Sequence, residues 1–222
     1  MITPRVKFFA TLSFAVSLLA PATVQADWSS LSVSVEEVES DWFFENNSRR
    51  SRITRLNLNF EEKTSAELRV GANMGRVSAR LSNTIGPRET QRFDASYFGV
   101  YLRYPLPLGE YFALHSKMTY QYHSGSENSI EDDAEDKIDW REFSLELGLS
   151  ARLGNFRVTP YAIYSDVSGE IVGESATDAF ESDNDISGGV NLDLFLEPTS
   201  YVRLRLSTGD SEEVSLIFAR EF

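Results

Sequence analysis

The chain has 222 residues, a formal net charge of −13 and no cysteine. Such an acidic balance argues against a nucleic-acid partner, because binding to phosphates requires a basic face. Without cysteine, an exported chain has to be held by burial or by a closed hydrogen-bond network.

The first 26 residues have the pattern of a secretory signal peptide. Arg5 and Lys7 give a basic start, an apolar stretch follows at 8–20, and the tripeptide at 24–26 resembles a small-residue cleavage site. We therefore predict a cleaved leader over 1–26. Its removal takes the formal net charge from −13 to −15, because it carries two basic residues and no acidic one.

After the leader, apolar residues recur at every second position, which is typical of β-strands and not of helices. No later segment approaches 18 consecutive apolar residues, which argues against a membrane-spanning helix. Asp27 rather than cysteine follows the leader, so no lipid anchor is expected, and we predict one domain over 27–222. Ten strands are expected, at about 29–38, 52–61, 65–81, 92–104, 111–122, 143–153, 156–166, 185–196, 201–208 and 213–222.

The expected connections alternate between two kinds. Tight turns are predicted at 61–64, 105–110, 154–155 and 197–200. Longer polar links are predicted at 39–51, 82–91, 123–142 and 167–184. Short turns on one rim and long loops on the other are typical of outer-membrane barrels, whose long loops face outward.

The two faces of the strands differ in a way that favours a membrane barrel over a soluble one. In the segment 143–153, leucines alternate with small or polar residues such as Gly148 and Ser150. Small residues suit a crowded lumen, and aromatic residues near the strand ends suit the two membrane interfaces. At Gly75 the apolar positions shift by one residue. We expect a β-bulge there, and the alternative is that this strand ends near Met74 and the count is eight.

The final residues carry a second export feature. Apolar residues alternate through Val214, Leu216 and Phe218 to a terminal Phe222, with Arg220 at a position where an apolar residue is usual. This run resembles the C-terminal assembly signal of outer-membrane β-barrel proteins.

With the leader and the alternating segments, the chain resembles the class of small bacterial outer-membrane β-barrel proteins over its whole mature length. The resemblance implies an all-β fold, a closed antiparallel up-and-down transmembrane barrel of about ten strands, in the cell outer membrane. It also implies contact with outer-membrane lipids including lipopolysaccharide, and insertion by the barrel-assembly machinery through the last strand. It implies no particular activity. We expect a monomer without a cofactor or metal.

The polar face would place charges of both signs in the lumen. They are Arg55, Arg69, Arg103, Lys117, Arg152, Arg157, Arg203, Arg205, Glu36, Glu67, Glu146 and Asp193. The leading hypothesis is an ion-pair network that plugs a narrow barrel, since buried charges have to be paired. The barrel would then have a structural or surface-interaction role. The alternative is a narrow passive pore whose surplus arginine favours anions.

The longer links are acidic, especially 127–142 and 166–185. We expect solvated loops, and the alternative is a divalent cation that bridges them to lipopolysaccharide phosphates. The link at 39–51 contains an apolar run, Trp42, Phe43 and Phe44, expected either to extend a lipid-facing girdle or to bind a partner. Its arginines, Arg49, Arg50 and Arg52, could meet lipopolysaccharide phosphates.

A hydrolase is the third hypothesis. His115 and Ser116 are adjacent on a strand, so their side chains leave opposite faces and cannot act together. His123 and Ser124 lie at the expected outer rim with carboxylates nearby, a set that would resemble the lipid A deacylases of outer membranes in residue types only. The chain contains no match to the histidine–serine motif of those enzymes.

Overall fold

The computed structural model describes residues 29–45, 47–64, 67–83, 90–127, 136–173, 176–182 and 185–222. The leader expected at 1–26 lies outside these residues. The strands are β1 (Ser29–Phe44), β2 (Asn47–Lys63), β3 (Arg69–Asn83), β4 (Thr90–Pro107), β5 (Phe112–Glu127), β6 (Lys137–Leu153), β7 (Phe156–Val172), β8 (Thr177–Ser182), β9 (Asp185–Glu197), β10 (Ser200–Gly209) and β11 (Ser211–Glu221). None of the described residues belongs to a helix long and apolar enough to cross a membrane.

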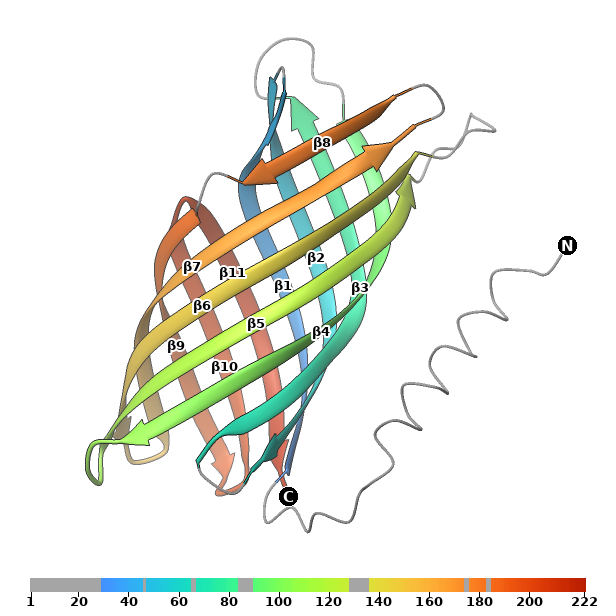
Figure 1. The fold of residues 1–222 in the computed structure, drawn as a ribbon. Coiled ribbons are helices and arrows are strands. Elements are labelled where there is room, and N and C mark those ends of the chain that lie inside the picture. The colour runs from blue at the N-terminus through green and yellow to red at the C-terminus, as the bar shows by residue number, and fades with distance from the viewer. Residues whose placement is uncertain are drawn as a thin grey trace, which may run out of the picture.

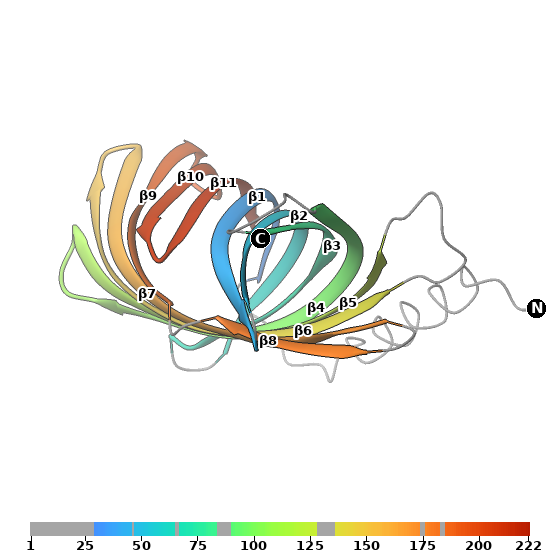
Figure 2. The ribbon, with the colours of Figure 1, turned by 90° about the horizontal axis from the view of Figure 1, so that it is seen from above.

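Ten of the strands close into a barrel (Figures 1 and 2). Strands β1 to β7 pair in chain order, β7 pairs with β9, and β9, β10 and β11 continue the sheet until β11 pairs with β1. Backbone hydrogen bonds between Ser29 and Phe222 complete the seam at one end, which we call the lower end. Closure pairs the backbone groups that hydrocarbon could not satisfy. The predicted closed antiparallel barrel is confirmed.

One further strand was not expected. β8 pairs with Ser168–Val172 at the end of β7 and with Trp42–Phe44 at the end of β1. It crosses the upper end of the barrel beside β7 (Figure 1). Above the level of the β10–β11 turn, β8 therefore fills the gap between β7 and β1. The link predicted at 167–184 thus contains a strand.

The other predicted links are also shorter than expected. Strands β1 and β2 together cover nearly all of 39–51, and β5 and β6 extend into 123–142 from both sides. The expected acidic loop is thereby reduced to residues near 128–135, which lie outside the described residues. The predictions placed the strand ends too early because the upper ends of the strands carry charged residues on their outer face, unlike the apolar outer face below.

An apolar belt surrounds the lower and middle part of the barrel. Outward leucines, valines and aromatic residues are exposed on all ten barrel strands. On β3 and β7 the exposed ones in this part are Val70 and Phe156, near the lower end. Phe60, Tyr104 and Phe112 are exposed near lower strand ends, and Tyr122 is exposed higher up. This arrangement matches a lipid-facing belt with aromatic residues at its borders.

We expect Leu147→Arg, in the middle of this belt, to lower the free energy of unfolding by about 2–4 kcal/mol, because it places a charge in hydrocarbon. Leu147 is 60% exposed on β6. Ser124→Arg is the matched control, since Ser124 is exposed on the outer face of β5 opposite Asp139. Urea unfolding of the folded barrel in lipid vesicles measures both. Equal costs at the two positions would mean that the belt is assigned incorrectly.

The upper part of the barrel is packed with apolar side chains that point inward. We call them the upper apolar cluster: Trp42, Ile53, Val77, Ala79, Leu81, Phe93, Ala95, Tyr97, Ile138, Trp140, Val167, Ile171 and Phe180. The Trp42 ring stacks on Phe180 of β8 at 4.4 Å, and it lies 5.8 Å from Trp140. Trp42 is fully buried. The expectation that it belongs to an exposed girdle or partner patch is therefore wrong.

Gly75 marks the level at which the apolar residues change sides. β3 pairs with β2 and β4 in an unbroken register through Gly75, so the predicted β-bulge is absent. The alternative of eight strands also fails, because β3 continues to Asn83. Below Gly75 the apolar side chains face outward to lipid, whereas above it Val77 and its successors face inward. A Cβ atom at Gly75 would lie 2.8 Å from the Tyr97 ring, which explains the glycine.

Candidate functional site in the lumen

The lumen below the upper apolar cluster is polar and contains a cavity of about 200 Å³. Serines and asparagines line much of its wall, from Ser30 near the chain ends to Asn57 and Asn191 higher up. At its upper end the lining becomes apolar, with Trp42, Ile53 and Val167. The charged side chains in this space form three groups, each built around inward positions of neighbouring strands.

The first group is centred on Asp193 of β9. Strand register places Arg157 of β7 and Arg203 of β10 directly beside it on the two neighbouring strands. Arg203 donates from Nε to Oδ1 at 2.6 Å and from Nη2 to Oδ2 at 3.0 Å, and Arg157 donates from Nε to Oδ2 at 2.6 Å. The Asp193 side chain is inaccessible to solvent. Both carboxylate oxygens are thus satisfied, as burial of a charge requires.

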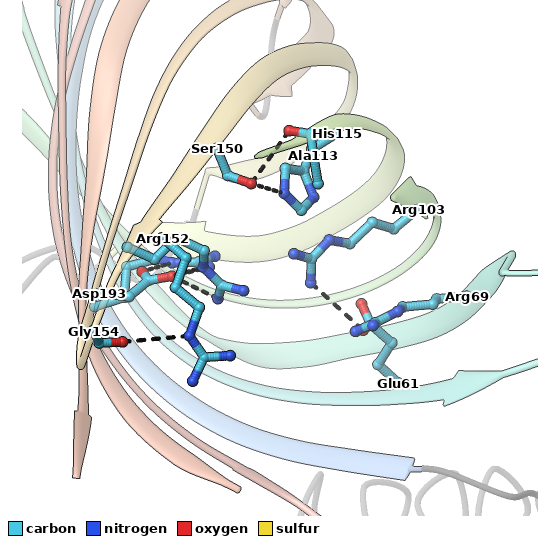
Figure 3. Close-up of polar contacts among 11 residues, drawn as sticks. Glu61, Arg69, Arg103, Ala113, His115, Ser150, Arg152, Gly154 and Asp193 are labelled. Carbon is cyan, nitrogen blue, oxygen red and sulfur yellow. Dashed lines mark hydrogen bonds and ion pairs between the residues drawn. The ribbon is translucent and has the colours of Figure 1, made fainter. Parts of the chain in front are cut away.

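The second group joins Glu61 of β2 to Arg69 of β3 and Arg103 of β4 (Figure 3). The guanidinium groups lie 3.3 Å and 3.6 Å from Glu61 Oε1. Arg69 and Arg103 are directly opposite each other in the sheet, where like charges repel, so the buried carboxylate between them offsets that repulsion.

The Tyr101 ring packs over Gly71, where a Cβ atom would overlap the ring.

The third group has more carboxylates than arginines. Arg55 pairs with Glu142 at 2.5 Å and with Glu36 at 3.8 Å. Arg205 pairs with Glu146 at 2.6 Å and with Glu213 at 2.8 Å. Lys117 lies opposite Glu146 in the strand register, and its Nζ sits 4.7 Å from the centre of the Tyr101 ring. Contacts such as Arg55–Glu142 and Arg205–Glu146 reach across the lumen between strands that are not neighbours.

Two residues predicted for this network lie elsewhere. Glu67 is exposed in the turn between β2 and β3, where Lys63 donates a hydrogen bond to it at 2.9 Å. That ammonium holds the pKa of the Glu67 carboxyl below its usual value. Arg152 is exposed, donates to the Gly154 carbonyl and covers the Phe195 ring, instead of pairing with a carboxylate. Strand alternation predicts both side chains to point into the lumen. It fails here because Glu67 lies in a turn and Arg152 lies next to one.

Three carboxylates of the network were missed by the sequence analysis. Glu61 was assigned to a turn, Glu142 to an outer link, and Glu213 was not singled out on the last strand. The signal was present for Glu142, which shares its parity with Ser144 and Glu146 on the polar face of β6. Strand pairing and lumen geometry, not composition, bring these carboxylates to their arginines.

A histidine and a serine meet in the lower lumen. His115 Nε2 lies 2.7 Å from Ser150 Oγ, and Ser150 also donates to the Ala113 carbonyl at 3.2 Å (Figure 3). Because the hydroxyl has one proton, donation to Ala113 requires Nε2 to donate to Oγ. His115 Nδ1 has no hydrogen-bond partner among the described residues. A nucleophilic serine needs the opposite proton direction and an acid behind the histidine.

His123 is not at an accessible rim. It is fully buried in the upper part of the barrel, with its ring stacked 4.2 Å from Trp140 and 5.0 Å from Tyr97. Ser124 points to the outer face of β5. The predicted set of His123, Ser124 and a loop carboxylate is therefore not brought together. Across the described ranges, no three histidine, aspartate or glutamate side chains are grouped so that they could hold a metal ion.

Comparison with known proteins gives matches of fold but not of sequence family. No family model matches the chain, and no curated protein matches it. Among solved structures, the translocator domain of the autotransporter NalP from Neisseria meningitidis has a TM-score of 0.50 at 11% identity and covers 97% of both chains. The β domain of the Bordetella autotransporter BrkA has a TM-score of 0.50 at 12% identity, with 88% of this chain and 98% of that chain covered.

Neisserial surface protein A also matches, with a TM-score of 0.46 at 10% identity over 86% of this chain and 97% of that chain. At these identities the likeness concerns the fold alone. The two structures with a TM-score of 0.50 agree with the closed antiparallel sheet. In its fold, this chain is similar to the bacterial outer-membrane β-barrels.

Proposed function

We propose that this protein is a non-conducting outer-membrane barrel, with a structural or surface-interaction role, whose upper end faces outside the cell. The observation that carries this proposal is the upper apolar cluster. A polar wall along the whole lumen favours the passage of water and ions. In this barrel, large aromatic rings from β1, β4, β6 and β8 point inward and pack together in the upper lumen.

The ion pairs below the cluster support the same conclusion. Arg55 and Arg205 each join carboxylates from different walls, so their side chains cross the lumen instead of lining it. The polar cavity of about 200 Å³ reaches Trp42, Ile53 and Val167 at its upper end, and all three belong to the upper apolar cluster.

A specific observation favours the pore as the second candidate. Near the lower end, the ion pairs among the described residues join four arginines to two carboxylates: Arg69 and Arg103 to Glu61, and Arg157 and Arg203 to Asp193. If the upper apolar cluster opened, this surplus of positive charge would favour anions.

Planar-bilayer recording of the purified protein separates the two functions. We expect little or no steady conductance for the wild type. The variant Trp42→Ala/Phe180→Ala removes the ring stack that joins β1 to β8, and we expect it to show frequent current steps with anion preference. Phe43→Ala, on the outer face beside Trp42, is the matched control and should stay closed. Steady anion-selective conductance of the wild type would instead establish the pore.

A further inference from the structure

Five arginines point outward from the upper parts of three neighbouring strands, although the chain as a whole is strongly acidic. They are Arg50 and Arg52 on β2, Arg76 and Arg80 on β3, and Arg92 on β4. All five are exposed. Asp94 is the one carboxylate that shares this described outer surface on the three strands.

Strand register aligns three of these arginines. Arg52 lies directly opposite Arg80, and Arg80 lies directly opposite Arg92, so the three form a continuous row across β2, β3 and β4. We call this the arginine row. Side chains opposite each other in a sheet have Cβ atoms about 5 Å apart, and like charges at this spacing destabilise the sheet. The row is therefore a cost to folding unless an anion binds it.

Among the described residues, carboxylates compensate only one end of the row. Arg52 pairs with Glu39 and lies 3.9 Å from Glu37, both on β1, and Arg50 also pairs with Glu39. Arg80 and Arg92 take part in none of the ion pairs formed among the described residues, and Arg80 lies between two other arginines. Within the described outer surface, these two guanidinium groups therefore have room for an external ligand.

The height of the row matches the membrane surface. Leu58, Met74 and Phe98 form the last fully apolar rung of the belt on these strands, and Arg76 lies opposite Leu56 on the next rung. The arginine row is six residues beyond the last fully apolar rung, roughly 20 Å along the strand at ~3.3 Å per residue. With a strand tilt of about 35–45°, the row stands about 15 Å above that rung and Arg76 about 5 Å above it, so together they extend through the headgroup layer.

Elsewhere at this height the described outer surface is acidic on β1 and β7 and of mixed sign on β6, where Arg141 lies near Asp139. Glu37, Glu39 and Asp41 point outward from β1, and Asp166 and Glu170 point outward from β7. A general attraction of the barrel to anionic headgroups is therefore not expected. The basic surface is restricted to one side of the barrel.

We propose that the arginine row, together with Arg76, binds the phosphate groups of a phosphorylated outer-leaflet glycolipid of the lipid A type. Guanidinium groups bind phosphate oxygens in a bidentate manner, and Arg76 and the row offer several from the edge of the belt through the headgroup layer. The proposal rests on the upper end facing outward, as in the proposed function, but not on whether the lumen conducts.

Native mass spectrometry of the full detergent-solubilised barrel tests this site, with bisphosphorylated lipid A added in the presence of EDTA. The chelator prevents divalent cations from bridging acidic side chains to phosphates. We expect Arg80→Gln/Arg92→Gln to bind lipid A about 30-fold more weakly than the wild type, since each interfacial basic residue contributes roughly fivefold in affinity. Arg141→Gln is the control, because Arg141 is an exposed arginine on the outer face of β6. It should bind as the wild type does.

Two comparisons on the wild-type protein need no variant and hold even if the double variant fails to fold. Dephosphorylated lipid A should bind at least tenfold more weakly than the bisphosphorylated form, and phosphatidylglycerol should also bind more weakly. Equal binding of the dephosphorylated form would overturn the proposal, because acyl chains would then explain the affinity. Equal binding of phosphatidylglycerol, or unchanged binding by the folded double variant, would also overturn it.

Discussion

Replacing Asp193 by alanine is expected to lower the free energy of unfolding by about 3–5 kcal/mol, because it leaves two arginines in the lumen without their counter-charge. Arg157 and Arg203 both donate to this carboxylate at 2.6 Å, and neither is more than 20% exposed. Urea unfolding followed by tryptophan fluorescence and by heat-dependent gel migration measures the loss.

Two further variants identify its cause. Asp166→Ala, on the exposed outer face of β7, removes a carboxylate without touching the lumen and should change the stability little. The triple variant Asp193→Leu/Arg157→Met/Arg203→Met removes all three charges and should recover most of the loss, since apolar residues often replace a buried ion-pair group without cost. No recovery in the triple variant would point to shape, not charge, as the contribution of Asp193.

Trp140→Ala is expected to cost about 3–5 kcal/mol, the usual range for removing a buried tryptophan. Trp140 is 1% exposed, and its ring stacks on that of His123. The centres of the Trp140 and Trp42 rings are 5.8 Å apart. The loss should appear in the same unfolding assay. Tyr122→Ala is a suitable control on the neighbouring strand, because Tyr122 is 52% exposed on the outer face.

This prediction distinguishes a packed core from a loose vestibule in the upper barrel. If Trp140→Ala were no more destabilising than Tyr122→Ala, the upper apolar cluster would not be close-packed. A lumen sealed by packed rings would then no longer be expected, whatever the bilayer recordings showed.

The barrel itself was predictable from the sequence because alternation is a local property. In β6, Leu145, Leu147 and Leu149 alternate with polar or small residues, and this period requires no knowledge of neighbouring strands. Lipid on one side and a polar lumen on the other preserve the alternation along the membrane-spanning part. The ten barrel strands and their antiparallel order follow from it.

The upper end of the barrel was not predictable in the same way. Trp42 and Val77 lie in strands with the same period of two. Above about Gly75, however, the apolar side chains face inward and the charged side chains face outward to water, the reverse of the arrangement in the membrane-spanning part. A sequence alone does not mark where the membrane ends. The alternation alone therefore predicts a bulge in β3 and a loop where the structure has β8.

The charged residues show the same division. The sequence determined that the lumen of this protein holds charges of both signs, because strand alternation fixes which side of the sheet a residue occupies. Only the tertiary structure decided that Glu142 reaches Arg55 and that Arg52, Arg80 and Arg92 form one row. Those relations depend on strand register and on contacts across a closed barrel, where residues distant in sequence come within a few ångströms of each other.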